Sequence, residues 1–250
     1  MTKNDRAVEP LRLSVQSATS APMVVGRVTL MLSGEAVPIE FEVPAAPVLA
    51  RDLLPIMEGL ADAMTARAER RSVASGRPIS CAAGCGACCR QPVPVTGIEA
   101  RRLARLVEAM PEPRRSEIRR RFDDAVAVLS AAGVLEKPAV GGHREQALRY
   151  FRMGVPCPFL EAESCSIHPQ RPLACREYLV TSPPQNCRDP QAETIAMVPL
   201  DAAASNALAA IDPDGGWLLL VLALQFAEGP EAVEEPRAAA VMLGEALRAL

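Results

Sequence analysis

The side chains of this chain that are best suited to chemistry are its eight cysteines, which lie in two blocks. They are Cys81, Cys85, Cys88 and Cys89 in the first block, and Cys157, Cys165, Cys175 and Cys187 in the second. Cysteines that serve only as small hydrophobic side chains are spread through apolar segments. These cysteines instead lie beside Gly, Pro, Arg and Ser. The pattern therefore predicts thiols that bind metal or carry out redox chemistry.

The expected compartment favours metal over disulfides. The first residues, MTKNDRAVEP, include acidic side chains and lack the apolar segment of a secretory signal. The longest apolar run, Trp217 to Leu224, is much shorter than the about 18 residues that cross a bilayer. We therefore expect a bacterial, cytoplasmic protein with no membrane partner. In a reducing cytoplasm, clustered thiols bind metal more often than they form disulfides.

Two conformations of the first block would bring its thiols together. In a helix, Cys81, Cys85 and Cys88 would share one face. In a loop around the glycines at 84 and 86, the backbone can wrap a cluster and offer N–H groups to its sulfurs. The adjacent Cys88 and Cys89 cannot easily bind one ion from the same side, so one of them serves a second metal, bridges two, or stays a free redox thiol. Eight thiolates can fill two tetrahedral sites, or one cluster with spare ligands.

Other polar side chains lie close to the second block. His168 follows Cys165 by three residues and is a candidate metal ligand, or a hydrogen-bond donor to a ligand. Its alternative is simple packing in a Pro-rich turn. Arg171 and Arg176 flank Cys175 and are candidate cofactor-binding residues, because they can donate hydrogen bonds to cluster sulfurs or lower thiol pKa values. Ion pairs with nearby glutamates are the alternative for both arginines.

The two blocks together resemble the bacterial CxxCxxCC family. The residues that carry the resemblance are Cys81-Ala-Ala-Gly-Cys85-Gly-Ala-Cys88-Cys89, Cys157-Pro-Phe-Leu, Cys165-Ser-Ile-His-Pro and Arg171-Pro-Leu-Ala-Cys175-Arg. The first gap is three residues long here, whereas the family pattern has two. The resemblance covers about residues 81–187 and implies a domain that chelates zinc or iron. A more distant resemblance, to flagellin lysine methylase, implies an iron–sulfur-dependent modification.

Zinc and iron–sulfur clusters both suit these ligands. Zinc binds readily to four cysteines. Iron–sulfur clusters use several cysteines, and Cys157-Pro158 is similar to the Cys-Pro ending of ferredoxin motifs. We favour a 4Fe-4S cluster slightly over zinc. The spacing of Cys81, Cys85 and Cys88 also matches radical S-adenosylmethionine enzymes, but the sequence predicts no parallel α/β barrel around it.

Helices are expected to position these thiols. Apolar residues at three- and four-residue steps predict a helix over 47–74. Thr96 and Glu99 predict a capping box at the start of the next helix. The other helices are expected at 97–110, 112–133, 144–152, 199–210, 215–228 and 236–249.

Residues 1–46 have the pattern of strands. A turn at Gly34-Glu35 predicts a β-hairpin in which Ile39, Phe41 and Val43 share one face. The sequence thus predicts a mainly α-helical α+β fold with an N-terminal β-hairpin, an irregular cysteine-ligated metal core and C-terminal helices. We expect three regions, which are a hairpin region at 1–46, a helical metal-binding domain at 47–198, and C-terminal helices at 199–250 that pack on it.

Charge narrows the class of function. A net charge of −3 argues against a nucleic-acid partner. The Arg-rich stretch from Arg101 to Arg121 has no interleaved aromatic residue for base stacking, so it predicts a solvated helix face. We expect a metal-binding protein that holds an iron–sulfur cluster or zinc. The alternatives are an iron–sulfur-dependent redox or modifying enzyme that acts on a protein or peptide partner, and a metal storage or delivery protein.

Overall fold

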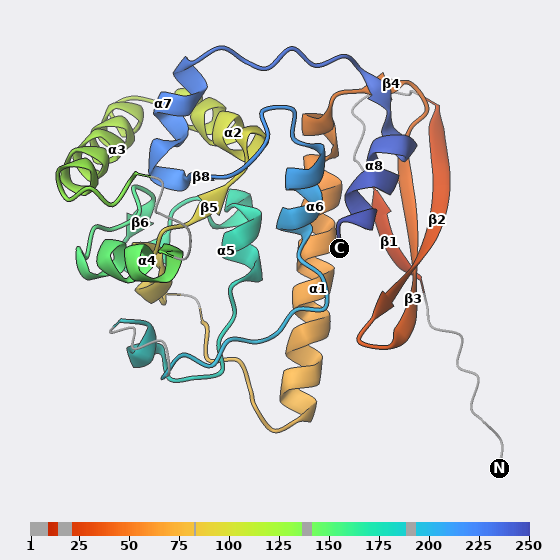
Figure 1. The fold of residues 1–250 in the computed structure, drawn as a ribbon, viewed down its shortest axis with the longest axis horizontal. Coiled ribbons are helices and arrows are strands. Elements are labelled where there is room, and N and C mark those ends of the chain that lie inside the picture. Colours follow the sequence, from red (N-terminus) through yellow and green to blue (C-terminus); the bar gives the residue numbers. More distant parts are fainter. Residues whose placement is uncertain (1–9, 15–21, 83, 137–141, 189–193) are drawn as a thin grey trace.

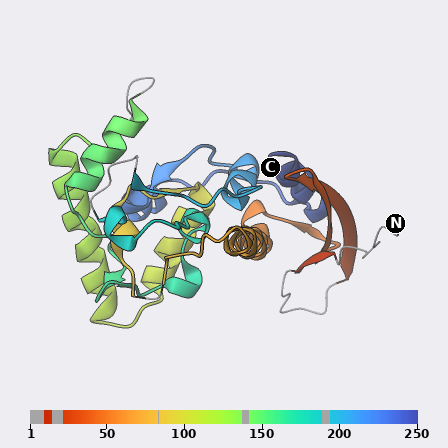
Figure 2. The same ribbon diagram turned by 90° about the horizontal axis from the view of Figure 1, so that it is seen from below.

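The computed structural model describes residues 10–14, 22–82, 84–136, 142–188 and 194–250. Helices predominate in these residues, as expected for a mainly helical α+β fold. The long helix α1 (Leu54–Ala74) lies between two halves of the molecule (Figure 1). Figure 2 shows α1 end-on, with the sheet on one side and most of the other helices on the opposite side. We call these parts the sheet half and the cysteine half.

The sheet half is built on the predicted β-hairpin. Strand β2 (Met23–Leu32) pairs antiparallel with β3 (Glu35–Pro44). The side chains of Ile39, Phe41 and Val43 lie on one face of β3, as predicted, and all three are buried. Strand β1 (Leu11–Ser14) adds to the other edge of β3 in parallel. Its four residues gave no sign of this pairing, because the register depends on β3.

One continuous core unites the sheet with three helices. The inner face of the sheet packs on α1, and α8 (Ala239–Arg248) fills the space between them. Helix α6 (Ala204–Ile211) packs along α1 and α8 and is shorter than the predicted 199–210. The largest fully buried side chains here include Ile39, Leu53, Ile56, Met57, Leu60 and Leu208. Two of the predicted C-terminal helices therefore belong to the sheet half, and the division into three regions remains a prediction.

Short strand pairs replace the first residues of three predicted helices. The pairs are β4 (Pro47–Val48) with β9 (Arg237–Ala238), and β5 (Pro94–Val95) with β8 (Leu218–Leu219). Each pair joins segments that are distant in sequence, so long-range hydrogen bonds override the local helical pattern. As a result, α1, α7 (Ala223–Glu228) and α8 begin later than the predicted 47, 215 and 236.

The cysteine half consists of the helices that surround the second block. They are α2 (Gly97–Glu108), α3 (Arg114–Ala131), α4 (His143–Arg152), α5 (Leu173–Glu177) and α7. The predicted capping box is confirmed, since Thr96 accepts the Glu99 N–H and Glu99 accepts the Thr96 N–H. Phe122 and Phe159 meet edge to face in the core, with ring centroids 5.4 Å apart. None of the helices in the described ranges is both long enough and apolar enough to cross a membrane.

The Arg-rich stretch is largely paired with acidic side chains. Within α3, the exposed Arg120 pairs with Asp124 at 3.0 Å. Arg102 joins α2 to α1 through Glu58. Because neighbouring carboxylates compensate these cations, the stretch does not form a continuous positive surface.

Candidate metal centre

The first cysteine block is a loop followed by a 3₁₀ helix, η2 (Ala87–Arg90), so the loop alternative describes it. Gly84 has a φ of +82°, a conformation that other residues rarely adopt. Gly86 lies against the second block, and a Cβ at this position would come within 2.6 Å of Leu160 Cδ1. The two glycines therefore allow a tight turn and a close approach of the blocks.

The two blocks lie against each other. The Cys157 N–H donates to the Cys89 carbonyl oxygen at 2.7 Å. The Arg90 guanidinium pairs with the Glu163 carboxylate at 2.7 Å. The prediction that the blocks meet in space is therefore confirmed, although they are far apart in sequence. That they enclose a metal remains a prediction.

A small hairpin presents two thiols of the second block. Its strands are β6 (Leu160–Glu161) and β7 (Ser164–Cys165). The Phe159 backbone donates a hydrogen bond to the Cys157 sulfur, and the Ile167 backbone does the same for Cys165. In both cases the donor follows its cysteine by two residues. Such N–H donors orient the sulfur and favour its thiolate form.

Four thiols from the end of the first block, the hairpin region and α5 are linked by the charges that they exert on one another, and we call them the α5 group. They are Cys89, Cys157, Cys165 and Cys175. Burial raises the pKa of Cys157 to about 12, and the charges of Cys165 and Cys88 add to this rise. Burial likewise raises the pKa of Cys175, with further contributions from the charges of Cys157, Cys88 and Cys165. The thiols of this group are thus close enough for their charges to act on one another.

Three other thiols form a separate set, which we call the loop group. They are Cys81, Cys85 and Cys187. Burial raises the pKa of Cys187 to about 11, and the charges of Cys81, Cys88 and Cys85 add to the rise. The Val180 N–H donates to Cys81 Sγ at 3.4 Å. The last cysteine of the second block therefore lies with the first cysteines of the first block.

Cys88 lies between the two groups. A hydrogen bond with Cys89 is the main cause that lowers the pKa of Cys88 to about 7, and the positive charge of Arg171 contributes. The Cys88 charge in turn raises the pKa of thiols in both groups. These thiols include Cys81, Cys157, Cys165, Cys175 and Cys187. The charge of Cys88 therefore acts on thiols of both groups.

All eight cysteines are free thiols. Among the residues that the structure describes, no three His, Cys, Asp or Glu side chains are already arranged to hold a metal ion. The thiols are thus gathered but do not form a closed coordination sphere, and metal binding requires their sulfurs to draw together. The donor set fits zinc and iron–sulfur clusters, because both take thiolate sulfur as ligand.

His168 and Arg171 form a pair at the edge of the cluster. The imidazole of His168 is exposed, and its Nδ1 lies 2.8 Å from Arg171 Nη1. Burial and the charges of Arg171 and Arg176 lower the pKa of His168. The charge of Arg171 also opposes the rise in the pKa of Cys165. Arg171 therefore acts on the thiols, while a ligand role for His168 stays a prediction.

Arg176 is buried and ties α5 to α1. Its guanidinium donates to Asp62 at 3.0 Å and to Glu58 at 3.2 Å. A further bond goes to the Arg171 carbonyl oxygen. These contacts fix the helix that carries Cys175, so they give Arg176 a positioning role. The prediction that Arg176 binds the cofactor is neither supported nor opposed by them.

Glu99 has a role that the sequence did not reveal. Its residue exposure is only 3%, and its carboxylate accepts the Leu173 N–H at 2.8 Å as well as the Thr96 N–H at 3.0 Å. Leu173 begins α5, so Glu99 links the start of α2 to the helix that carries Cys175. Its charge contributes to the raised pKa of Cys175. Only the capping-box pattern was available as a signal for this residue.

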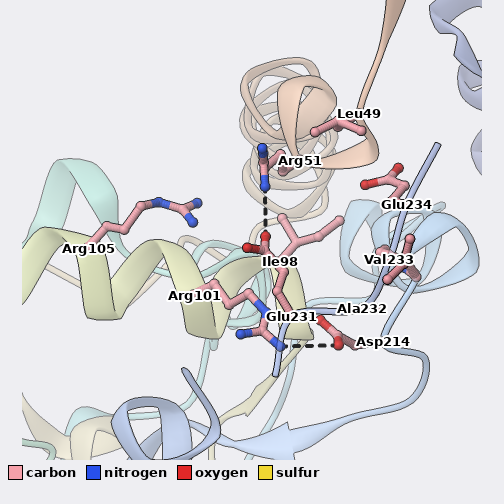
Figure 3. Close-up of a pocket in the computed structure, with 11 residues that line it drawn as sticks. Leu49, Arg51, Ile98, Arg101, Arg105, Asp214, Glu231, Ala232, Val233 and Glu234 are labelled. Atoms are coloured by element: carbon pink, nitrogen blue, oxygen red, sulfur yellow. Dashed lines mark hydrogen bonds and ion pairs between the residues drawn. The ribbon is translucent and has the colours of Figure 1, made fainter. Parts of the chain in front are cut away.

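A cavity of about 320 Å³ lies apart from the thiols, between the start of α2 and the segment before β9. It is lined by Leu49, Arg51, Ile98, Arg101, Arg105, Pro213, Asp214, Glu231, Ala232, Val233 and Glu234. Figure 3 shows the ion pairs Arg51–Glu231 and Arg101–Asp214 at its walls. Since no cysteine lines this cavity, it is not part of the candidate metal centre.

Comparison with known families assigns chemistry to the cysteine segment. The model of the CxxCxxCC family, described as "Putative zinc- or iron-chelating domain", matches residues 80–195. The matched segment contains all eight cysteines. No curated protein and no solved structure matches the chain. The match supports metal binding by this segment in general and leaves open which metal it takes.

Proposed function

We propose that this protein holds an iron–sulfur cluster through the thiols of its two cysteine blocks, because residues 80–195 match the model of the CxxCxxCC family. The observation that carries the proposal is the contact between the two blocks of free thiols, in which the Cys157 N–H donates to the Cys89 carbonyl oxygen at 2.7 Å. Zinc is the alternative metal, since sets of four thiolates suit it equally well.

Hydrogen-bond donors and positive charge around the sulfurs support iron–sulfur. Backbone groups of Phe159, Ile167 and Val180 donate to three of the thiols. The charge of Arg171 acts on Cys88 and Cys165. Hydrogen bonds to the sulfurs and nearby charge are the means by which proteins stabilise iron–sulfur clusters and set their potentials.

The bound metal would supply ligand bonds where regular structure is sparse. Within 153–188, α5 is five residues long and the two strands have two residues each. The chain's own residues orient the ligands. The Phe159 and Ile167 backbones aim the hairpin thiols, and Arg176 and Glu99 hold the helix that carries Cys175.

The test is elemental analysis with a UV–visible spectrum on protein purified without oxygen. We expect brown protein with about four irons and matching sulfide per cluster. Cys165→Ser should lower the iron content, whereas Ser130→Ala, at an exposed position of α3, should leave it unchanged. Colourless protein that carries zinc would retain metal binding and reject the cluster. Protein that takes up neither metal, even after reconstitution under reducing conditions, would contradict the whole proposal.

Metal storage or delivery is a second candidate function, which the exposure of Cys81 favours. A carrier should release its metal reversibly and stay folded, whereas a structural site should unfold on release. The modifying-enzyme alternative requires an open metal position beside a substrate cavity, whereas the cavity of about 320 Å³ is lined by no cysteine.

A further inference from the structure

The outer edge of β2 is the longest strand edge that the described residues leave without a partner. β2 pairs with β3 along ten residues, and β1 adds to the other edge of β3, so the order in the sheet is β1-β3-β2. In Figure 1, β2 lies at the outer margin of the sheet half. Every second residue of such a strand points its N–H and C=O groups away from the sheet, where they can bind a further strand.

The β2 edge lacks the features that protect strand edges from pairing. Proteins shield an edge with proline, with bulges, with several charged side chains or by keeping the strand short. β2 contains no proline, its register with β3 is unbroken from Met23 to Leu32, and its one charged side chain is Arg27. The opposite edge of the sheet belongs to β1, which has only four residues. A partner strand therefore fits β2 better than β1.

Three of the exposed large hydrophobic side chains belong to this one strand. Val25 and Met31, on the outer face of the sheet, are 58% and 67% exposed, and Val24 is 42% exposed. The neighbouring strand β3 instead has Glu40 on its outer face, opposite Arg27 of β2. Apolar exposure is thus concentrated along the open edge, as expected for a surface that another chain covers.

We propose that β2 pairs antiparallel with β2 of a second copy of this chain, about a two-fold axis at the Val28 pair, which joins the two three-stranded sheets into one. In this register Val25 lies opposite Met31 of the second copy. Because the interface is two-fold symmetric, this contact between exposed apolar side chains occurs twice. Arg27 lies opposite Thr29 of the second copy, so the strand is complementary to itself.

The charge of Arg27 selects among the possible registers. Its guanidinium donates to Glu40 of β3 at 2.8 Å, so the charge is compensated within its own sheet. A register centred on Arg27 would bring two guanidinium groups face to face, and like charges directly opposite destabilise a sheet. A register centred on Thr29 would place Val25 opposite Ser33, in the turn that follows β2. The register centred on Val28 avoids both faults.

The oligomeric state of the full-length protein tests the proposal, measured by light scattering across a dilution series under reducing conditions. We expect a dimer that dissociates on dilution. Val25→Lys and Met31→Glu should each raise its dissociation constant about tenfold, because each change places two charges in an apolar contact. Val73→Lys is the matched control and should leave the constant unchanged, since Val73 on α1 is similarly exposed, at 54%.

Two results of this experiment would overturn the proposal. Monomeric wild-type protein at every concentration would exclude the second copy and leave a different protein as the occupant of the edge. A dimer that both single variants retain unchanged would show that the copies meet at another surface. Neither result affects metal binding, which elemental analysis measures separately.

The double variant Val25→Lys with Met31→Glu tests the register. In the proposed register the two new charges lie opposite each other across the interface, so the dissociation constant should return to within about threefold of the wild-type value. The two positions are about 20 Å apart within one strand, so the rescue cannot come from a pair inside one chain. Dimerisation weaker than in either single variant would overturn the proposed register.

Hydrogen exchange of the wild-type protein provides a test that does not depend on how the variants fold. Amides at the β2 edge should exchange more slowly in concentrated than in dilute protein, because pairing protects them. The amides of α2 should exchange at the same rate in both. A dimer whose β2 exchange does not depend on concentration would overturn the proposal.

Discussion

The sheet half and the cysteine half are held together in different ways. The sheet half has one continuous apolar core, to which β1, β3, α1, α6 and α8 all contribute. In the cysteine half, buried apolar side chains are divided among three smaller clusters. Hydrophobic burial can stabilise the first arrangement directly. The second lacks a single core around residues 153–188, so ligand bonds are the natural source of the missing stability.

The largest difference between the two halves should appear when the metal is removed. Structural metal sites contribute on the order of 10 kcal/mol to folding. We expect the metal-free protein to lose hydrogen-exchange protection in residues 153–188 while β3 and α1 remain protected. Hydrogen exchange with mass spectrometry measures both halves in one experiment. Equal loss of protection in both halves would show that the metal stabilises the whole chain, and no loss would show that burial suffices.

A core substitution in the sheet half should lower the stability of the protein without changing its metal content. Ile39 on β3 is fully buried, so Ile39→Ala removes apolar contacts and leaves a cavity. We expect a loss of about 2–5 kcal/mol in the free energy of unfolding, with unchanged metal content. Urea denaturation and elemental analysis check the two outcomes. Val25→Ala is the matched control, because Val25 lies in the adjacent strand and is 58% exposed.

In the sheet half, the sequence predicted the hairpin strands but not the pairing of strands that are far apart in the chain. Alternation alone was enough for the β2–β3 hairpin, because one face of β3 is buried. The pairing of β1, and of β4 with β9, depends on segments far away in the chain. Local propensity contains no information about such pairs, so the affected helices were predicted to begin too early.

The candidate site shows the same limit. The residue types and spacing predicted thiol chemistry in both blocks, and the blocks do meet. The association of Cys187 with Cys81 could not be predicted, because it depends on how 180–187 folds back along the first block. Glu99 also shows this limit. Its capping-box contact with Thr96 was predicted, but its hydrogen bond from the Leu173 N–H could not be, because the two residues are 74 positions apart in the chain.

The halves should respond to pH in opposite directions in the metal-free protein. Although burial opposes it, hydrogen bonds from Ser33, Arg71 and Arg67 lower the pKa of Asp201. Its contribution to stability is therefore present above the unfolded pKa of about 4 and is lost as pH falls. In the cysteine half, burial raises the pKa of Cys157 to about 12 and that of Cys187 to about 11.

The raised thiol pKa values give the opposite sign. Their stabilising contribution is complete below the unfolded thiol pKa of about 8.5, and it is lost as pH rises towards 11 to 12. Each proton that the folded state retains and the unfolded state releases lowers the free energy of unfolding by about 1.4 kcal/mol per pH unit. Hydrogen exchange after brief incubation at pH 3 and pH 10 should show early opening of the Asp201 contacts in acid and of the cysteine blocks in alkali. If the same half opened first at pH 3 and at pH 10, the opposite pH responses expected for the two halves would be wrong.

The smallest effect should come from the outer surface of the cysteine half. Arg120 and Asp124 form an ion pair on α3 with side chains 67% and 64% exposed. Water and salt screen such pairs, so Arg120→Ala should cost at most about 0.5 kcal/mol and leave metal content unchanged. Urea denaturation at low and at high salt checks this value. A loss of more than about 1 kcal/mol would mean that α3 supports the cysteine blocks through its surface charges. The expected small loss would instead mean that the stability of the cysteine half comes from its thiols and from the buried contacts of Glu99 and Arg176.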